Sequence, residues 1–215
     1  MSGALQAVFT NLRSFIVPVP ATGEAYGGGY FAGLIATGGG GVATHLLIIA
    51  PKATGENLSK TWKTTNTDTT GTSSAIDGPT NSANMNDANH PAAQFCEGLT
   101  IGGYSDWYMP ARNELEVCYY FLKPTTTLND TATGANANAV SPEPISTNYT
   151  TGSPIQTTAT AFRTGGAEVF NSANYWASTQ FDTTRAAAQY FLNGNQANGP
   201  KNDPNPVRAV RRIAI

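Results

Sequence analysis

The chain has 215 residues, of which only 12% are charged, with a formal net charge of −2 and a pI of about 5.6. Proteins that bind nucleic acid in general carry a basic excess, so this composition argues against that class of function. Hydrophobic residues make up 40% of the chain, enough for a buried core, and the polar remainder is mostly uncharged. Short strands and long ordered loops suit such a composition better than a helical bundle.

Residues 1–26 are predicted to form an arm, because Pro18, Pro20 and Gly23 interrupt any regular element. The apolar side chains of the arm would be unfavourable in water. We expect the arm to dock on a neighbouring subunit or a larger assembly, or to pack back on its own domain. The chain starts without a basic region followed by an apolar run, and its longest apolar stretch is too short to cross a bilayer. We therefore expect no usual secretion signal and no membrane insertion, and a folded domain over residues 27–215.

The domain is predicted to begin with a hairpin. Residues 30–36 and 42–50 are rich in aromatic and β-branched residues, and the four glycines 38–41 between them favour a turn. No Gly-Lys-Ser/Thr follows these glycines, which argues against a phosphate-binding loop. Residues 54–80 are rich in Thr, Ser, Asn and Gly and are predicted to be a long loop anchored by Trp62.

The middle of the chain is predicted to contain two helices. Residues 84–98 have apolar residues on one helical face, with Pro91 starting or kinking a turn. A short aromatic strand over residues 104–110 follows, and then a helix over residues 111–122, which ends before Pro124. Each predicted helix contains one of the two cysteines of the chain, Cys96 and Cys118. Buried free thiols are the favoured interpretation, and a disulfide remains the alternative.

The last third of the chain is predicted to be loop, helix and sheet in turn. Residues 125–157 are low in charge and loop-like, and residues 158–170 are predicted to be helical with an interruption at two glycines. The end of the chain favours a small antiparallel meander, with a turn at 193–195 and strands over residues 175–180, 187–192 and 207–213.

Three of these segments resemble one known family. Residues 103–115 contain Asp-Trp-Tyr-Met-Pro-Ala-Arg-Asn-Glu-Leu, which resembles the Asp-Trp-aromatic-x-Pro-x-x-x-Glu-Leu signature of the Lcl C-terminal domain family. The run Tyr-Trp-Ala-Ser-Thr at 175–179 is similar to the family's Tyr-Trp-Ser-Ser-Thr. Residues 193–196 and 207–212 resemble its closing turn and last strand. The order and spacing of the segments also agree, over about residues 28–213.

The resemblance implies an α+β fold, a variant of the C-type-lectin-like fold with a small antiparallel sheet, two to three helices and long loops. Members occur in bacterial surface adhesins and in tailed-phage virion proteins. The phage members carry a Gly-Gly-Tyr-x-Ala-Gly motif similar to residues 28–33, and the opening residues 2–8 resemble the start of such a protein. The implied function is a phage virion surface protein, at a tail-fibre tip or as a decoration, whose lectin-like module binds a host receptor. A purely structural collar, head or fibre decoration is the alternative.

The resemblance also implies the partners of the chain. We expect the arm to attach it to other virion proteins, and we expect a homo-oligomer, with a trimer favoured. The partner at the host cell surface would be a glycan or a protein. The location implied is the virion surface, after synthesis in the host cytoplasm.

The motif residues are expected to form the scaffold. The large tryptophan side chains suit the junction of helix and sheet, and Glu114 is placed to cap a helix or to pair with an arginine of the last strand. The expected structural residues are Asp106, Trp107, Pro110, Glu114, Trp176, Arg208 and Arg211.

Receptor contacts are expected from the loops of the tail, whose Asn, Gln and Thr side chains make adaptable hydrogen bonds. Where many relatives carry an aromatic pair, this chain has three alanines at 186–188, which indicates a different target or a face buried by a neighbouring chain. Clustered positive charge in the tail also leaves binding of an acidic polysaccharide open, through Arg185, Lys201, Arg208, Arg211 and Arg212. The expected contact residues are Gln180, Asp182, Thr184, Arg185, Gln189, Asn193, Asn195, Gln196, Asn198, Lys201, Asn202 and Asp203.

No enzyme, cofactor or metal site is expected. His45 and His90 are the only histidines, and neither has another His or Cys at metal-ligand spacing. No Gly-x-Ser-x-Gly turn occurs, although a Ser-His-Asp arrangement stays open at this stage. Calcium is less favoured, because the sugar-binding tripeptides of calcium-dependent lectins are absent and the Pro-Glu-Pro at 142–144 is more simply a turn former.

Overall fold

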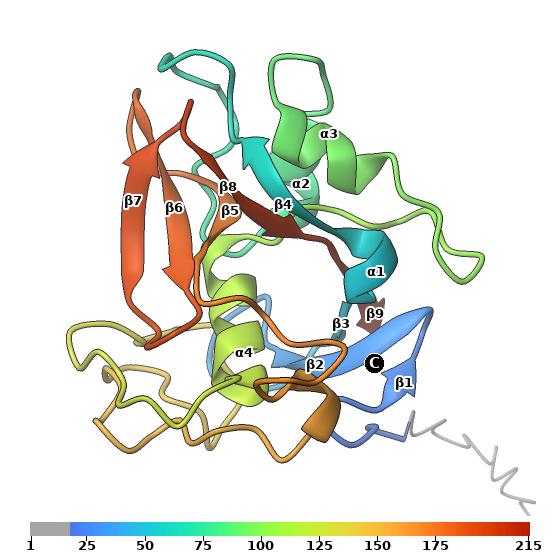
Figure 1. Ribbon diagram of the computed structural model, residues 1–215, viewed down its shortest axis with the longest axis vertical. Helices are drawn as coiled ribbons and strands as arrows, with labels where there is room; N and C mark the ends of the chain where they lie inside the picture. The colour runs from blue at the N-terminus through green and yellow to red at the C-terminus, as the bar shows by residue number, and fades with distance from the viewer. Residues whose placement is uncertain (1–17) are drawn as a thin grey trace, which may run out of the picture.

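The computed structural model describes residues 18–215 and consists of three antiparallel sheets and four short helices within that range (Figure 1). It is a mixed α+β architecture, as predicted. Residues 1–17, which include most of the predicted arm, lie outside the described residues. No helix in the described range is long and apolar enough to cross a membrane.

The first sheet joins the start of the domain to its end. Its order is β1 (Ala25–Tyr26), β2 (Gly29–Ile35), β3 (His45–Ile49) and β9 (Val210–Ala214). Strands β2 and β3 are the predicted hairpin. Their connection needs glycine, because residues 39–41 all have φ near +75° to +80°, where side chains with a Cβ are strained.

The other two sheets combine two strands that the sequence predicted, near residues 175–180 and 187–192, with strands that the sequence pattern conceals. One contains β5 (Asn174–Gln180), β6 (Arg185–Tyr190) and β7 (Gln196–Pro200), and the other pairs β4 (Glu56–Thr61) with β8 (Pro204–Arg208). The predicted last strand was wrong in one respect. Residues 204–208 pair with β4 and residues 210–214 with β3, so the chain changes sheets at Ala209.

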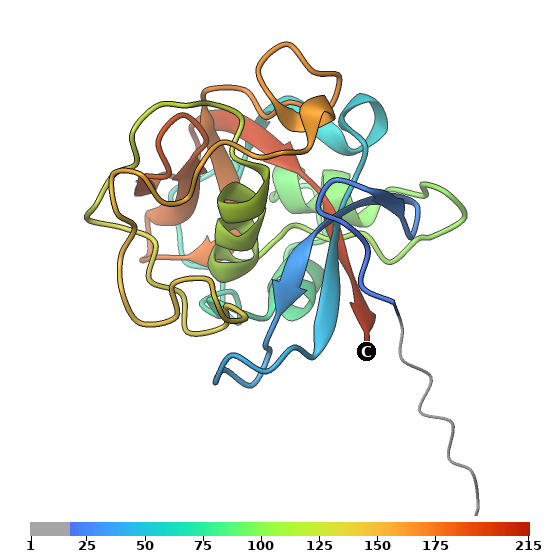
Figure 2. The same cartoon turned by 90° about the horizontal axis from the view of Figure 1, so that it is seen from below.

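The helices are α1 (Lys52–Gly55), α2 (Gly78–Ala83), α3 (Pro91–Glu97) and α4 (Arg112–Leu122). Helix α4 was predicted, and almost all of its residues are buried between the sheets and the long loops of residues 125–157 (Figure 2). The helix predicted over residues 84–98 is shorter than expected, because residues 84–90 form a turn and loop and only α3, which begins at Pro91, is helical. Two further predictions were wrong. Residues 54–80 are not one loop, since they contain β4 and the start of α2. Residues 158–170 form only a 3-10 turn at Thr160–Phe162, because two glycines interrupt the segment.

Buried tryptophans connect the elements of the core. Trp62 donates its indole N–H to the carbonyl of Ala177 at 2.9 Å, and Trp176 donates to the carbonyl of Lys60 at 3.0 Å. Each tryptophan therefore satisfies its polar atom while burying a large apolar surface. Cys96 and Cys118 are free and buried, as favoured from the sequence.

The second part of the predicted arm lies against the domain. The N–H of Gly23 donates to the carbonyl of Phe31 at 2.8 Å, the N–H of Phe31 donates to the carbonyl of Glu24 at 2.9 Å, and β1 pairs with β2. Residues 23–26 thus extend the first sheet.

Glu114 joins helix α4 to the last strand. Its carboxylate accepts the backbone N–H of Ala111 at 2.8 Å, a guanidinium N–H of Arg212 at 2.6 Å and the hydroxyl of Tyr108. Arg212 also donates to the carbonyl of Ile76. Burial raises the pKa of Glu114, and the Arg212 charge opposes that rise. One buried carboxylate thereby holds α4, the aromatic segment and β9 together.

Gly78, the first residue of α2, packs directly on this carboxylate. A Cβ added at Gly78 would lie 2.1 Å from Glu114 Oε2 and 2.6 Å from the Tyr108 ring. We expect Gly78→Ala to lower the free energy of unfolding by about 3 kcal/mol, because a buried ion pair must move to admit the methyl group. Gly152→Ala is the matched control, since a Cβ there meets nothing within 4 Å, and it should change stability by less than about 0.5 kcal/mol. Equal denaturation midpoints for the two variants would contradict the close packing.

Candidate functional site

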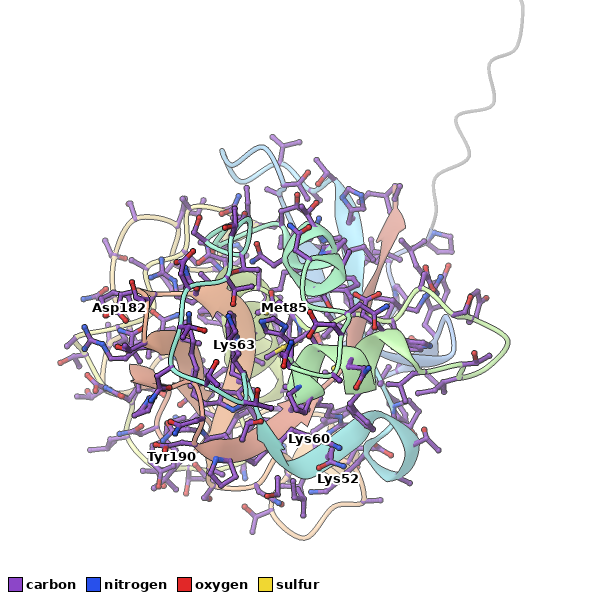
Figure 3. All side chains as sticks on the ribbon, turned by 90° about the horizontal axis from the view of Figure 1, so that it is seen from above. Lys52, Lys60, Lys63, Met85, Asp182 and Tyr190 are labelled. Carbon is purple, nitrogen blue, oxygen red and sulfur yellow. The ribbon has the colours of Figure 1, made fainter. Side chains whose placement is uncertain are left out.

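The expected contact residues lie at opposite ends of the β5–β6–β7 sheet. Residues 180–185 and 201–203 occupy one end, and residues 193–196 occupy the other. Strand β6 between them has six residues and spans roughly 20 Å. The structure therefore divides the predicted set into two separate surfaces. Figure 3 looks onto the first end, which is the top of Figure 1.

We call this first end the loop face and define it as residues 63–69, 180–185 and 198–203. Its three loops meet on one buried cation. Lys201 is 0% exposed, and its ammonium donates to the carbonyls of Thr67 (2.8 Å) and Thr183 (2.9 Å) and to the Gln180 side chain. The same ammonium lies 4.8 Å from the centre of the Trp62 ring. Burial lowers the pKa of Lys201 to about 8, and nearby Lys63 adds to that effect.

This position corrects the prediction that Lys201 contacts a receptor. Its side chain supports the loop face from below and is not on the surface. Gln180 has a similar role. Its side-chain amide N–H donates to the Asp68 carboxylate at 2.8 Å, and its side-chain oxygen accepts the backbone N–H of Thr69 at 2.8 Å. Lys63, labelled in Figure 3, donates to the carbonyl of Asp68 at 2.6 Å and so fixes the same loop from its other side.

The exposed part of the loop face is built around an aromatic side chain. Phe181 is 53% exposed, and the guanidinium of Arg185 lies 4.9 Å above its ring. Asp182 pairs with Arg185 at 2.6 Å and accepts the backbone N–H groups of Thr184 (2.9 Å) and Arg185 (2.8 Å). Arg185 and these donors lower the pKa of Asp182 to about 2. The turn therefore presents a phenyl ring, a guanidinium and hydroxyl groups in one fixed arrangement.

Phe181 lies within a loop expected to make receptor contacts, residues 180–185, but it was not among the contact residues named from the sequence. Only polar loop residues were expected to make contacts. The signal that could have identified Phe181 is an aromatic residue within a polar turn. Thr184, Asn198, Asn202 and Asp203 are exposed on the loop face, as expected of contact residues.

The second end of the sheet is held by internal contacts. Asn195 donates to Asp130 at 2.6 Å, and the N–H of Asp130 bonds to the carbonyl of Asn193 at 2.9 Å. Gln189 is 1% exposed and donates to the carbonyl of Gly194 at 2.7 Å, which corrects its prediction as a contact residue. Asn193, Asn195 and Gln196 are half-buried, so this end offers less free side chain than the loop face.

The tail arginines do not form a basic surface. Arg208 is 0% exposed and binds Glu168 and the carbonyl of Ala50, and Arg211 pairs with Asp106 at 2.7 Å. Arg212 pairs with Glu114, as described above. Carboxylates of the same chain therefore pair with all three guanidinium groups. Of the five cationic residues considered, only Arg185 is exposed, and it pairs with Asp182, so the hypothesis of a polyanion site on the tail was wrong. The structural role predicted for Arg208, Arg211, Glu114 and Asp106 agrees with these contacts.

One histidine takes part in an Asp-His-hydroxyl chain. His90 Nδ1 lies 2.8 Å from Asp87 Oδ1, and its Nε2 lies 3.0 Å from Thr69 Oγ1. The order of groups is that of a nucleophilic triad. However, His90 is 4% exposed and Thr69 8%, and Lys63 also donates to this hydroxyl, so a substrate has no direct access to it. The chain joins the 84–90 loop to the loop face. Among residues 18–215, no group of three or more His, Cys, Asp or Glu side chains could hold a metal ion.

The role of Lys201 can be tested by removing its charge. Lys201→Met removes one donor from each of the Thr67 and Thr183 carbonyls and from the Gln180 side chain, so we expect the free energy of unfolding to fall by about 2–4 kcal/mol. Asn202→Ala, at the exposed neighbouring position, should change it by less than about 0.5 kcal/mol. Chemical denaturation measures both. Similar stabilities for wild type and Lys201→Met would show that the buried ammonium does not support the loop face.

Comparison with known proteins identifies the family. The family model described as the Lcl C-terminal domain matches residues 57–211, which include α4, the loop face, Arg208 and Arg211. No curated protein matches the chain. Because the family model covers well over half of the sequence, the chain belongs to the Lcl C-terminal domain family.

Proposed function

We propose that the chain is a non-enzymatic phage virion surface protein, at a tail-fibre tip or as a decoration, that binds a host-surface glycan or protein through the loop face. The observation that carries the proposal is the exposed Phe181–Arg185 pair on a rigid base. An exposed aromatic ring with a guanidinium is a typical binding anchor. The buried ammonium of Lys201 holds the backbone beneath the pair, so little conformational freedom is lost on binding.

The C-type-lectin-like fold is part of this proposal. Family membership, the small antiparallel sheets, helices α3 and α4 and the long loops of residues 125–157 all support it. The attachment to a particle rests on the resemblance of the chain to phage members and on the apolar residues of the arm, which lie outside the described residues. A homo-oligomer, with a trimer favoured, remains part of the same proposal.

A structural decoration without a receptor is the second candidate. The alanines at 186–188 were an argument for it, as a face that a neighbouring chain could cover. The structure weakens that argument, because the side chains of Ala186 and Ala188 are buried inside the molecule, at 0% and 4% exposure. They face the core, so they do not form an outer surface that copies of the chain would cover.

Binding to cells separates the two functions. We expect the purified protein to bind cells that the phage infects and not resistant cells. Phe181→Ala and Arg185→Ala should each weaken binding about tenfold, with little change in melting temperature, because both side chains are largely exposed. Leu128→Ala is the matched control, since that apolar side chain is 68% exposed on a different loop, and it should bind as the wild type does. Absence of binding to either cell type would support the structural decoration. Undiminished binding by both loop-face variants would place the contact elsewhere.

A further inference from the structure

Two carboxyl groups are buried between α4 and the loop of residues 129–150. Glu116, on α4, is 0% exposed, and Glu143, on the loop, is 3% exposed. The ion pairs found within residues 18–215 include neither of them. Two buried carboxylates without a cation are strongly unfavourable, so a further interaction must stabilise them.

The hydrogen bonds show how the two groups differ. Glu116 accepts the Tyr149 hydroxyl at 2.5 Å and the Asn136 side-chain amide at 2.6 Å, and both donors stabilise its ionised form. Neither carboxyl oxygen of Glu143 has a donor, although both are buried. Asn136 lies between the two groups, because its side-chain amide binds Glu116 and its backbone N–H donates at 3.2 Å to the carbonyl of Pro144, the residue after Glu143. A proton on Glu143 would give its unpartnered carboxyl group a donor that Glu116, which already accepts two hydrogen bonds, can receive.

The surroundings contain no group that could replace this proton. Of the charged and titratable side chains nearby, Arg208 pairs with Glu168, and Lys123 donates to Asn129 and to the carbonyls of Thr127 and Pro154. Glu114 is paired with Arg212. The remaining groups are neutral, because burial raises the pKa of each: Cys118, Tyr119 and Tyr149. Burial raises the pKa of Glu116 to about 7, and burial together with the Glu116 charge raises that of Glu143 well above its usual value.

The pair is connected to the second end of the β5–β6–β7 sheet. The Tyr149 ring lies against the β6–β7 turn, where a Cβ added at Gly194 would be 2.9 Å from it. Thr133 donates to the carbonyl of Gly194 at 3.0 Å, and Asp130 bonds to Asn193 and Asn195. The loop that carries Glu143 therefore also holds this turn.

We propose that Glu116 and Glu143 share one proton that holds the 129–150 loop against α4, and that loss of this proton at alkaline pH releases the loop together with the β6–β7 turn. This proposal does not rest on the proposed binding to a host receptor. Its effect has a definite sign. An unfolded Glu has a pKa of about 4.3, and the folded pair binds protons more strongly, so the contribution of the pair to stability is fully present below that pH and falls as the pH rises through about 7.

Glu143→Gln tests the proposal, because its amide can donate to Glu116 and does not titrate. We expect the melting temperature of the wild type to fall by roughly 5 °C or more between about pH 5 and about pH 8.5. In Glu143→Gln the fall should be less than about half as large. Glu97→Gln changes a partly exposed carboxylate on α3 and should keep the wild-type profile. Equal pH dependence in wild type and Glu143→Gln would overturn the proposal.

Two measurements on the wild type do not depend on a variant that folds. Carboxyl carbon NMR should find Glu resonances that titrate near or above pH 7. The absence of such resonances would contradict a shared proton. Hydrogen exchange, corrected for intrinsic rates, should lose protection in residues 136–149 with rising pH before it does so in β2 and β3. A melting temperature raised by Ca²⁺ and lowered by a chelator would mean that the pair holds a cation and that the proposal is wrong.

Discussion

The ion pair between Glu114 and Arg212 is the contact on which the rest of the fold depends. It joins the first turn of the central helix to the last strand, and that strand completes the sheet that begins at β1. Because Glu114 is fully buried, its charge is stable only if every donor stays in place. The surrounding elements, including Gly78, must therefore approach within van der Waals distance of one carboxylate. This constraint explains why Glu114, four positions after Pro110 in the motif, depends on Arg212 in the distant tail.

Sequence reasoning succeeded where one local signal decides the structure. Helix α4 has apolar residues at helical spacing and a proline after its end, and the glycine-linked hairpin has an unambiguous turn. It failed where pairing decides. Strand β7, Gln-Ala-Asn-Gly-Pro, has no β-branched residue and is a strand only because β6 lies beside it. The change of sheets at Ala209 was equally hidden, since the residues before and after it form one continuous strand-like pattern.

The candidate surface was predictable in its location but not in its composition. The loop after β5 was expected to be exposed, and it is. Burial of Lys201 and Gln189 could not be foreseen, because a polar residue in a tail loop has the same sequence pattern whether it faces solvent or holds the backbone of a neighbouring loop. The arginines show the same difficulty. A cluster of positive charge in the sequence became three separate internal ion pairs, since each carboxylate partner lies about 40 or more positions away along the chain.

The two cysteines have a consequence for where the protein can function. Both thiols are buried and unpaired, and burial raises the pKa of each, so the reactive thiolate is scarce. The fold thus needs no oxidant to mature and offers little for one to attack. A chain of this kind keeps the same covalent structure in a reducing compartment and in an oxidising one, and it can pass from one to the other without an enzyme that forms or rearranges disulfides.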